Sequence, residues 1–308
     1  MATHDLSWDD AGALHGSFSR DYPPRLTIDP GDTVRFATLP SGWEIDANGT
    51  RHTPRDPERD RGHALTGPVA IRGAEPPLHL AVRIGTITPG DWGYTGAGGA
   101  FGLNPLLGLG QEPHLRMNWR LDQEAGFAIN PTGHRVSMRP FLGVMGMAPD
   151  LPGIQSTVPP RGTGGNIDCR ELVAGSILYL PVAVQGGLFS AGDGHAAQGD
   201  GEVGGIAIEC PMRSVHLTFD LVDQPLVETP YANTGAGWIT FGFDEDLNQA
   251  ALFALNAMLT LMARLLGIGD RREALAIATA VVNLRITQMV NGVRGVHAVL
   301  PHGALHAP

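Results

Sequence analysis

The sequence predicts an α+β fold that is predominantly β, with two helices near the C-terminus. Three observations support this fold class. Glycine (42) and proline (24) make up about a fifth of the 308 residues, against roughly an eighth in average soluble proteins, so turns are frequent. Short apolar runs broken by Gly and Pro dominate most of the chain, and the last quarter changes to helical spacing. With 17% charged residues and ordinary hydrophobic content, the chain is a folded globule.

The predicted N-terminal lobe, residues 1–160, is antiparallel and β-sandwich-like. Over residues 25–120, runs such as TVRFATL and LHLAVRIGTI end at Pro- and Gly-containing turns, which is typical of strands and hairpins. Residues 48–67 are polar, charged and interrupted by prolines, so we expect a loop that can fold over a site. Residues 140–160 again alternate small apolar strands with proline turns.

The rest of the chain, residues 161–308, is predicted to form a mixed α/β lobe that carries the main site motifs and the two helices. Its β-branched apolar segments flank residues 192–202 and place that stretch between two strands. Residues 247–266 have apolar side chains at helical spacing, and Gly267 supplies a C-cap.

A second helix is predicted directly after the first. Asp270 and Glu273 form a capping box at its start. The apolar residues that follow form a broad helical face that ends near Gly292.

The net charge and the N-terminal sequence indicate which binding partners and which location to expect. The net charge of -10 and the scattered arginines argue against a nucleic-acid partner and against an anionic membrane surface. The N-terminus lacks a basic region followed by an apolar stretch, and no run approaches the roughly 18 apolar residues of a membrane span. We therefore expect a cytoplasmic protein in which Cys169 and Cys210 are free thiols.

All 21 basic residues are arginine, and the chain has no lysine. Schiff-base chemistry, the P-loop, the Ser-Lys amidases and the Glu-Lys-Cys nitrilases all require an ammonium group, so these mechanisms are excluded. A Gly-x-Ser-x-Gly elbow is also missing. Cys169 is a weak candidate nucleophile, because no histidine is adjacent to it in sequence.

Residues 192–202 read Gly-Asp-Gly-His-Ala-Ala-Gln-Gly-Asp-Gly-Glu and form the strongest local signal. Asp193, His195, Asp200 and Glu202 supply one imidazole and three carboxylates, the groups that a divalent metal or an acid/base pair requires. The spacing matches neither a calcium-binding helix-loop-helix nor the helical two-histidine zinc motif. A solvated turn is the alternative interpretation.

The sequence TGGNID at residues 163–168 is the best distant partner for this stretch. Asn166 and Asp168 point the same way on an extended segment, so Asn166 can orient a carbonyl and Asp168 can ligate a metal. A simple Asx turn is the alternative for this short motif. His63 is the other imidazole in a loop, where a surface position is the alternative.

Six segments carry a resemblance to a known family. They are TIDPGDTVRF, LTGPVAIRGAEP, RPFLGVMGMAP, TGGNIDCREL, SILYLPVAVQGGLFSAGDGHAAQGDGEV and LRITQMVNGVRGVHAVLP. Together, in this order over about residues 25–301, they resemble the acetamidase/formamidase family. The resemblance implies hydrolysis of the carbon–nitrogen bond of a short amide to a carboxylate and ammonia. It also implies a β-rich lobe with a mixed α/β lobe, homo-oligomers and, in some members, a bound divalent ion such as zinc or calcium.

The resemblance also assigns individual positions. Those that fall on the motifs of the family are Asn166, Asp168, Asp193, His195, Asp200 and Glu202, and His63 lies where members carry a histidine before Thr-Gly-Pro. The chain departs from the family at residues 37–44, ATLPSGWE, where many members have Glu-Thr and a short Asp- and Gly-rich segment. Glu44 can replace the missing acid, and a surface position is its alternative.

The resulting mechanistic hypothesis is a metal-dependent one. Asp168 and His195 hold a divalent ion, with Asp193 or Glu202 completing its shell, and the ion lowers the pKa of bound water. Glu202 then takes the proton of the water and delivers it to the leaving nitrogen.

The backbone N–H groups of Gly164 and Gly165 are expected to stabilise the oxyanion. His63 and Glu44 are expected to contact the substrate. Two alternatives remain open: a larger amide or carbamate as substrate, and a metal-stabilised binding module without catalysis.

Overall fold

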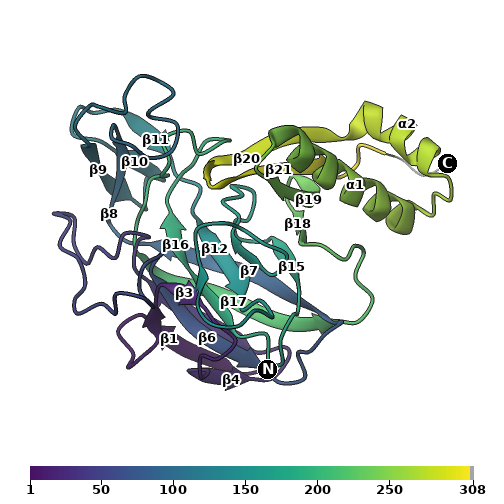
Figure 1. Cartoon of the computed structure of the whole chain (residues 1–308), viewed down its shortest axis with the longest axis horizontal. Helices are drawn as coiled ribbons and strands as arrows, with labels where there is room; N and C mark the ends of the chain where they lie inside the picture. The colour runs from purple at the N-terminus through teal and green to yellow at the C-terminus, as the bar shows by residue number, and fades with distance from the viewer. Residues whose placement is uncertain (306–308) are drawn as a thin grey trace.

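The computed structural model describes residues 1–305 and confirms a predominantly β fold with two helices close to the C-terminus (Figure 1). The largest sheet has nine strands. In order across the sheet, they are β1 (Thr3–Ser7), β5 (Thr33–Thr38), β17 (Met212–Val222), β7 (His79–Pro89), β15 (Ile177–Pro181), β18 (Tyr231–Thr234), β19 (Gly237–Asp244), β21 (Val293–Leu300) and β20 (Asn283–Asn291).

A second, six-stranded sheet packs against the first. Its strands are β14 (Gly164–Asn166), β12 (Phe141–Met147), β16 (Phe189–His195), β6 (Leu65–Ile71) and β2 (Leu14–His15), with β4 (Leu26–Ile28) paired to β6. The aromatic ring of Phe189 on β16 lies 6.2 Å from that of Phe36 on β5 and 5.0 Å from that of Phe219 on β17. The two sheets therefore share one apolar core, as expected of a sandwich-like arrangement.

Two smaller sheets complete the β structure. The four-stranded sheet contains β8 (Trp92–Ala97), β9 (Leu115–Asp122), β10 (Phe127–Ile129) and β11 (Arg135–Ser137), and it lies at the upper left of Figure 1. The other is formed by β3 (Ser17–Phe18) and β13 (Gln155–Ser156). The predicted lobe boundary at residue 160 stays a prediction, while β12 and β14 pair across it.

The first predicted helix is confirmed to the residue as α1 (Leu247–Leu266). Gly267 ends it in the left-handed conformation, φ 69°, and donates its N–H to the carbonyl of Ala263. A side chain at Gly242 on β19 would collide with the backbone of α1 at Ala250, so the helix packs closely on the sheet. Glycine at this position is what permits the close approach.

The second helix, α2 (Arg271–Val281), begins as predicted, with the side chain of Asp270 accepting a hydrogen bond from the Arg272 N–H at 2.8 Å. It ends about ten residues earlier than predicted. The apolar residues up to Asn291 form β20 instead, and a turn at Gly292, φ 78°, returns the chain into β21. The expectation of a helix to Gly292 was wrong because pairing with β21 satisfies these backbone groups, and Asn-Gly is a strong hairpin signal.

Two further boundaries differ from the sequence-based expectations. The loop predicted over residues 48–67 ends earlier, because Leu65 already begins β6. The acidic stretch predicted as a loop begins inside β16, which carries Asp193 and His195 on its last three residues. A strand position fixes these side chains more rigidly than a loop does.

Within residues 1–305, one helix, α1, has the length and composition of a membrane-crossing helix, with a mean hydropathy of 1.5. The core helix of a domain passes the same test, and α1 buries Ala254, Met258 and Leu261 among other residues against the sheet. Packing therefore accounts for part of the apolarity of α1, while Leu252 and Phe253 on the same helix are exposed.

Candidate active site

Five ionisable side chains converge at the end of β16, and we refer to them as the acidic cluster. They are Asp168, Asp193, His195, Glu202 and Glu209, and all are buried. The imidazole Nε2 of His195 lies 3.2 Å from Asp193 Oδ1 and 3.1 Å from Glu209 Oε1. Four carboxylates around one imidazole, away from water, are an arrangement that folding stability alone does not favour.

Backbone pairing brings the members together from distant parts of the sequence. Asp193 and His195 are two residues apart on β16, so they share one face of the strand. Asp168 follows β14, whose partner β12 also pairs with β16. Glu209 forms an isolated bridge with His195. Glu202 follows β16 in the glycine-rich turn.

Gly143 on β12 provides the space in the middle of the cluster. A Cβ atom at this position would lie 2.5 Å from Asp168 Oδ1 and 2.8 Å from His195 Cε1, and would also collide with Asp193 Oδ2. A glycine here therefore leaves a small space that is bounded by one imidazole and two carboxylates.

The backbone is strained at three members of the cluster. Asp168, Asp193 and Glu202 have φ angles of 55°, 59° and 46°, in the left-handed region that side chains other than glycine rarely adopt. Each such residue costs of order 1–3 kcal/mol and persists where the surrounding structure requires it, which is common at functional sites. The strain directs these carboxylates to one point.

Burial and mutual charge set the protonation of the cluster. Burial, assisted by the charge of Asp193, raises the pKa of Asp168 to about 8. Burial and then the charge of Asp168 raise the pKa of Glu202 well above its usual value. Burial and Asp193 likewise raise the pKa of Glu209. The cluster thus contains carboxyl groups that hold protons near neutral pH.

Asp193 and His195, the central pair of the cluster, are instead favoured in their ionised forms. Burial disfavours ionisation of Asp193, but the adjacent His195 outweighs burial and holds the pKa of Asp193 below its usual value. Burial also disfavours the imidazolium of His195. The charges of Asp193 and Glu209 overcome this effect and raise the pKa of His195 well above that of a free histidine. The pair is therefore ionised in the absence of another cation.

The residues of the acidic cluster fit a divalent metal ion. Three buried atoms have no hydrogen-bond partner among residues 1–305: Asp168 Oδ1, His195 Nδ1 and Glu202 Oε2. Two overlapping groups, Asp168/Asp193/His195 and His195/Glu202/Glu209, have ligand atoms within 4.8 Å of one another. Carboxylate oxygens with an imidazole nitrogen form a common donor set for zinc.

Neighbouring polar side chains orient the cluster. The side-chain amide of Asn291, at the tip of the β20–β21 hairpin, donates to Asp168 Oδ2 at 2.6 Å. The side-chain amide of Gln198 donates to the backbone carbonyl of Asp168 at 2.8 Å. The hydroxyl of Ser41 donates to Glu209 Oε2 at 2.8 Å. Such partners fix the direction in which the carboxylates point.

Several predicted residues lie around the cluster with specific contacts. Asn166 is buried, donates to the Val158 carbonyl at 3.1 Å, and has an Oδ1 without a partner in the described chain. The Gly164 N–H donates to the Arg161 carbonyl at 3.0 Å, which argues against its predicted role as an oxyanion donor. Gly165 adopts φ 101° on β14, and its role stays a prediction.

The alternative interpretation of Glu44 as a surface residue was wrong, because its side chain is buried. The side chain is 2% exposed, accepts a hydrogen bond from the Tyr94 hydroxyl at 2.9 Å, and lies 3.7 Å from both Arg51 and Arg116. It is therefore a compensated buried acid beside the cluster, and contact with a substrate stays a prediction.

His63 lies in a cavity of about 280 Å³ that we call the His63 pocket. Ser41, Trp43, Arg51, Arg55 and Arg61 also line it. The His63 Nδ1 atom lies 2.8 Å from the Thr157 hydroxyl. Because Ser41 also contacts Glu209, this pocket reaches the acidic cluster.

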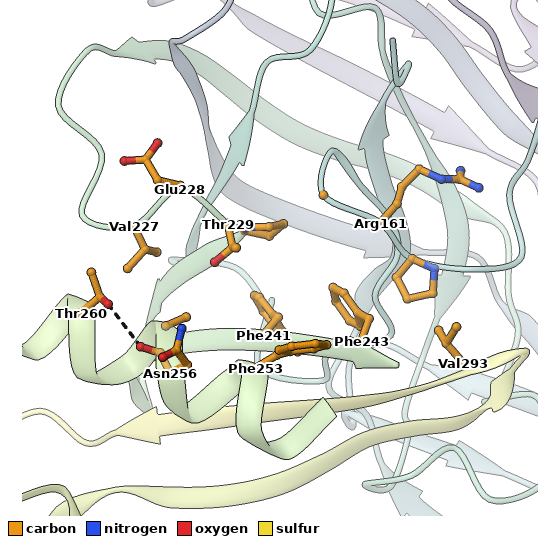
Figure 2. Close-up of a pocket in the computed structure, with 15 residues that line it drawn as sticks. Arg161, Val227, Glu228, Thr229, Phe241, Phe243, Phe253, Asn256, Thr260 and Val293 are labelled. Carbon is orange, nitrogen blue, oxygen red and sulfur yellow. Dashed lines mark hydrogen bonds between the residues drawn. The ribbon is translucent and has the colours of Figure 1, made fainter. Parts of the chain in front are cut away.

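Two larger cavities lie beside the four-stranded sheet and beside α1. One of about 540 Å³ lies against the four-stranded sheet and is lined by Glu202, Gln198, Arg139 and Arg170 among others. The other, of about 500 Å³, lies between α1, β19 and residues 227–230, where Figure 2 shows three phenylalanine rings. Of the described residues that line this second cavity, none belongs to the acidic cluster.

Two positions that the sequence highlighted lie outside the cluster. Asp200 is held by Arg285 at 2.6 Å and points away from the metal-ligand groups. The Cys169 thiol donates to Glu171 at 3.4 Å and groups with His297, a histidine that is distant in sequence. Burial raises the pKa of Cys169 well above its usual value, so the thiol stays protonated and is a poor nucleophile.

Sequence reasoning missed three residues of the site: Glu209, Gly143 and Asn291. Glu209 had a usable signal, since it is the lone acid in the apolar run IAIECPM. Asn291 had another, because Asn-Gly marks a hairpin tip. Gly143 had none, because its importance depends on which strands flank it.

Comparisons with known proteins show what the chain is similar to. The model of the acetamidase/formamidase family matches residues 2–156 and 152–235. The chain is 28% identical over 248 residues to a formamidase of Methylophilus methylotrophus, covering 64% of this chain and 61% of that protein. It is 28% identical over 253 residues to an acetamidase of Mycolicibacterium smegmatis, covering 63% and 62%. The chain thus spans less than two thirds of the length of these relatives.

The fold is likewise similar to that of a solved protein. The crystal structure of an acetamidase from Bacillus halodurans superposes with a TM-score of 0.85 at 26% identity, covering 96% of this chain and 97% of that chain.

Proposed function

The chain belongs to the acetamidase/formamidase family, and on that basis we propose that it hydrolyses the carbon–nitrogen bond of a short amide to a carboxylate and ammonia. The observation that carries the proposal is the acidic cluster, in which four buried carboxylates gather around one imidazole and Gly143 leaves a space beside Asp168, Asp193 and His195. Relatives named formamidase and acetamidase support the same reaction.

An amide resists water because its carbonyl is a poor electrophile and its nitrogen a poor leaving group. Asp168 and His195, with the carboxylates of Asp193, Glu202 or Glu209, would hold a divalent ion, which would polarise the amide carbonyl and lower the pKa of water. The imidazole donor favours zinc over calcium, which prefers oxygen ligands alone.

Glu202 is the proposed proton carrier. Its Oε2 atom is buried without a hydrogen-bond partner in the described chain, and its side chain lines the cavity of about 540 Å³. In its ionised form, the Glu202 carboxylate accepts a proton from water and returns it to the leaving nitrogen. Asp193 and Glu209 hold the His195 ring in place meanwhile.

The test is metal analysis of the purified protein together with ammonia release from formamide and acetamide. Removal of the metal by a chelator should abolish release, and addition of zinc should restore it. Unchanged turnover in a metal-free protein would contradict the metal role. Lack of ammonia from either amide, in a metal-loaded and folded protein, would count against short-amide hydrolysis itself.

Cys169→Ala is the control for a covalent mechanism. The thiol is protonated and donates a hydrogen bond to Glu171, so we expect turnover of the variant to remain within about twofold of the wild type. A complete loss of turnover in the folded variant would instead assign the thiol a direct role.

A cytoplasmic location and a homo-oligomeric state stay proposals. The exposed side chains of Leu252 and Phe253 on α1 support self-association, because isolated monomers seldom expose large apolar neighbours. Light scattering on a size-exclusion column measures the state directly.

A further inference from the structure

The His63 pocket has an unusual charge for the site of a neutral amide. Arg51, Arg55 and Arg61 line it together with His63, and within the described chain no carboxylate lines it. The chain as a whole carries a net charge of -10. A concentration of positive charge in one small cavity of an acidic protein points to a negatively charged ligand.

Two of these arginines lack an acidic partner. Among residues 1–305, neither Arg55 nor Arg61 forms an ion pair with a carboxylate within 4.0 Å, whereas Arg51 lies 3.7 Å from Glu44. The Arg55 Nε atom is buried and has no hydrogen-bond partner in the same range. The Nε–H group of Arg61 donates to the Pro57 carbonyl at 2.7 Å. Because a carbonyl is neutral, this bond leaves the positive charge of Arg61 uncompensated.

The pocket is held in shape by the fold. The Arg55 guanidinium stacks on the Trp43 ring, 4.4 Å from its centroid. The indole N–H of Trp43 donates to the Gly62 carbonyl at 2.8 Å, directly before His63. Trp43 also has φ 69°, a strained conformation for a bulky residue. A guanidinium stacked in this way is oriented for planar recognition of a carboxylate.

The pocket is also joined to the acidic cluster. Ser41 lines the pocket and donates to Glu209 at 2.8 Å, and Glu209 in turn contacts His195 at 3.1 Å. The backbone carbonyl of Ala64, the residue after His63, lies so close to Gly192 that a side chain there would collide with it. Gly192 precedes Asp193. The pocket thus adjoins the cluster through Ser41, and the residue after His63 packs against β16.

The cavity of about 540 Å³ differs in this respect. Its Arg170 lies 3.9 Å from Asp200, and the carboxyl of Glu202 lines it together with Arg139 and Arg170. Of these two cavities, only the His63 pocket is lined by arginines without a carboxylate.

Resting on the proposed amide hydrolysis, we infer that the substrate is an amide that carries an anionic group, such as the monoamide of a short dicarboxylic acid, and that Arg55 and Arg61 bind this anion. The oxygen of water adds to the amide carbon, the carbon–nitrogen bond breaks, and both protons of water end on the leaving nitrogen. The products are a dicarboxylate and ammonium. A neutral amide gains nothing from these arginines, whereas a carboxylate forms charge-assisted hydrogen bonds with them.

The experiment compares matched amides. Succinamate is measured against butanamide and glutaramate against pentanamide, as kcat/KM for ammonia release, in the wild type, Arg55→Gln, Arg61→Gln and the double variant. We expect the charged amide to be preferred about tenfold or more, and each substitution to reduce that preference by about tenfold. Arg72→Gln, an exposed arginine paired with the exposed Asp29, controls for net charge and should keep the preference.

A wild type that prefers the neutral amides, or a preference unchanged in the folded double variant, would overturn the inference. Arg61 is exposed, so Arg61→Gln stays folded even if Arg55→Gln does not. Calorimetric titration with succinate measures anion binding without turnover, and we expect the double variant to lose it. If neither formamide, acetamide nor any charged amide is hydrolysed, the proposed function fails, and the titration still decides whether the pocket binds an anion.

Discussion

The side-chain amide of Asn291 donates a hydrogen bond of 2.6 Å to Asp168 Oδ2, joining residues that are 123 positions apart in the sequence. The bond ties the tip of the β20–β21 hairpin to the acidic cluster. It uses one oxygen of Asp168 and leaves the other, Oδ1, directed into the space beside Gly143. The C-terminal hairpin, which follows the two helices, thereby becomes part of the site.

Asn291→Ala should lower amide hydrolysis by about 10- to 100-fold, because loss of a bond that orients a metal ligand typically has an effect of that size. Metal content and ammonia release are measured together. Asn283→Ala, at the exposed start of the same strand, should behave as the wild type. Equal activity of the two variants would contradict the positioning role of Asn291.

Gly143→Ala should remove metal binding and lower activity by about 100-fold or more, since misplacement of catalytic groups by about 1 Å has effects of this size. The added methyl would lie 2.5 Å from Asp168 Oδ1 and 2.8 Å from His195 Cε1. Gly269→Ala is the matched control, because no atom lies within 4 Å of a Cβ at that position. Metal content by mass spectrometry tests the prediction, and a Gly143→Ala protein that retains its ion would refute it.

Glu202→Gln should lower kcat by about 100- to 10,000-fold, as expected for the loss of a general acid/base group. The melting temperature should stay the same or rise, because the amide removes a buried carboxyl that is close to Asp168. Glu228→Gln changes an exposed glutamate and serves as the control for charge. Full turnover by a folded Glu202→Gln enzyme would indicate that another carboxylate carries the proton.

His15 should make the fold sensitive to acid. Burial lowers the pKa of His15 to about 4, whereas the unfolded chain takes up this proton near pH 6.5. As the pH falls from about 6.5 to about 4, the unfolded state binds more protons than the folded state. The free energy of unfolding therefore decreases over this window, by up to about 3 kcal/mol from this group. Above about pH 6.5, neutral His15 makes its full contribution to the free energy of unfolding.

Urea unfolding at about pH 7 and about pH 5 measures this loss. His15→Gln removes the titrating group while it retains a polar side chain for the hydroxyl of Ser190, which lies 3.0 Å from His15 Nε2. The decline between the two pH values should be smaller in His15→Gln. Identical declines in both proteins would assign the acid sensitivity to other groups.

Local patterns were sufficient for features that depend on neighbours in sequence. The limits of α1 and its cap at Gly267 follow from helical spacing and from the left-handed preference of glycine, and both are confirmed. Asp193 and His195 could be predicted to act together, because both lie in the short glycine-rich stretch of residues 192–202. The end of α2 could not be predicted, because the apolar residues after Val281 suit a helix face and a paired strand equally well. Only their pairing with β21 decides for the strand.

By itself, the sequence determined the family, the predominantly β fold with two C-terminal helices, and the motifs that carry Asp168, Asp193, His195 and Glu202. Only the tertiary structure brought Glu209 and Asn291 to these residues, turned Asp200 away toward Arg285, and gathered Arg55 and Arg61 in one pocket. The physical reason is that strand pairing acts between segments that are far apart in the chain, so the neighbours of a side chain across a sheet leave no periodic pattern in the sequence.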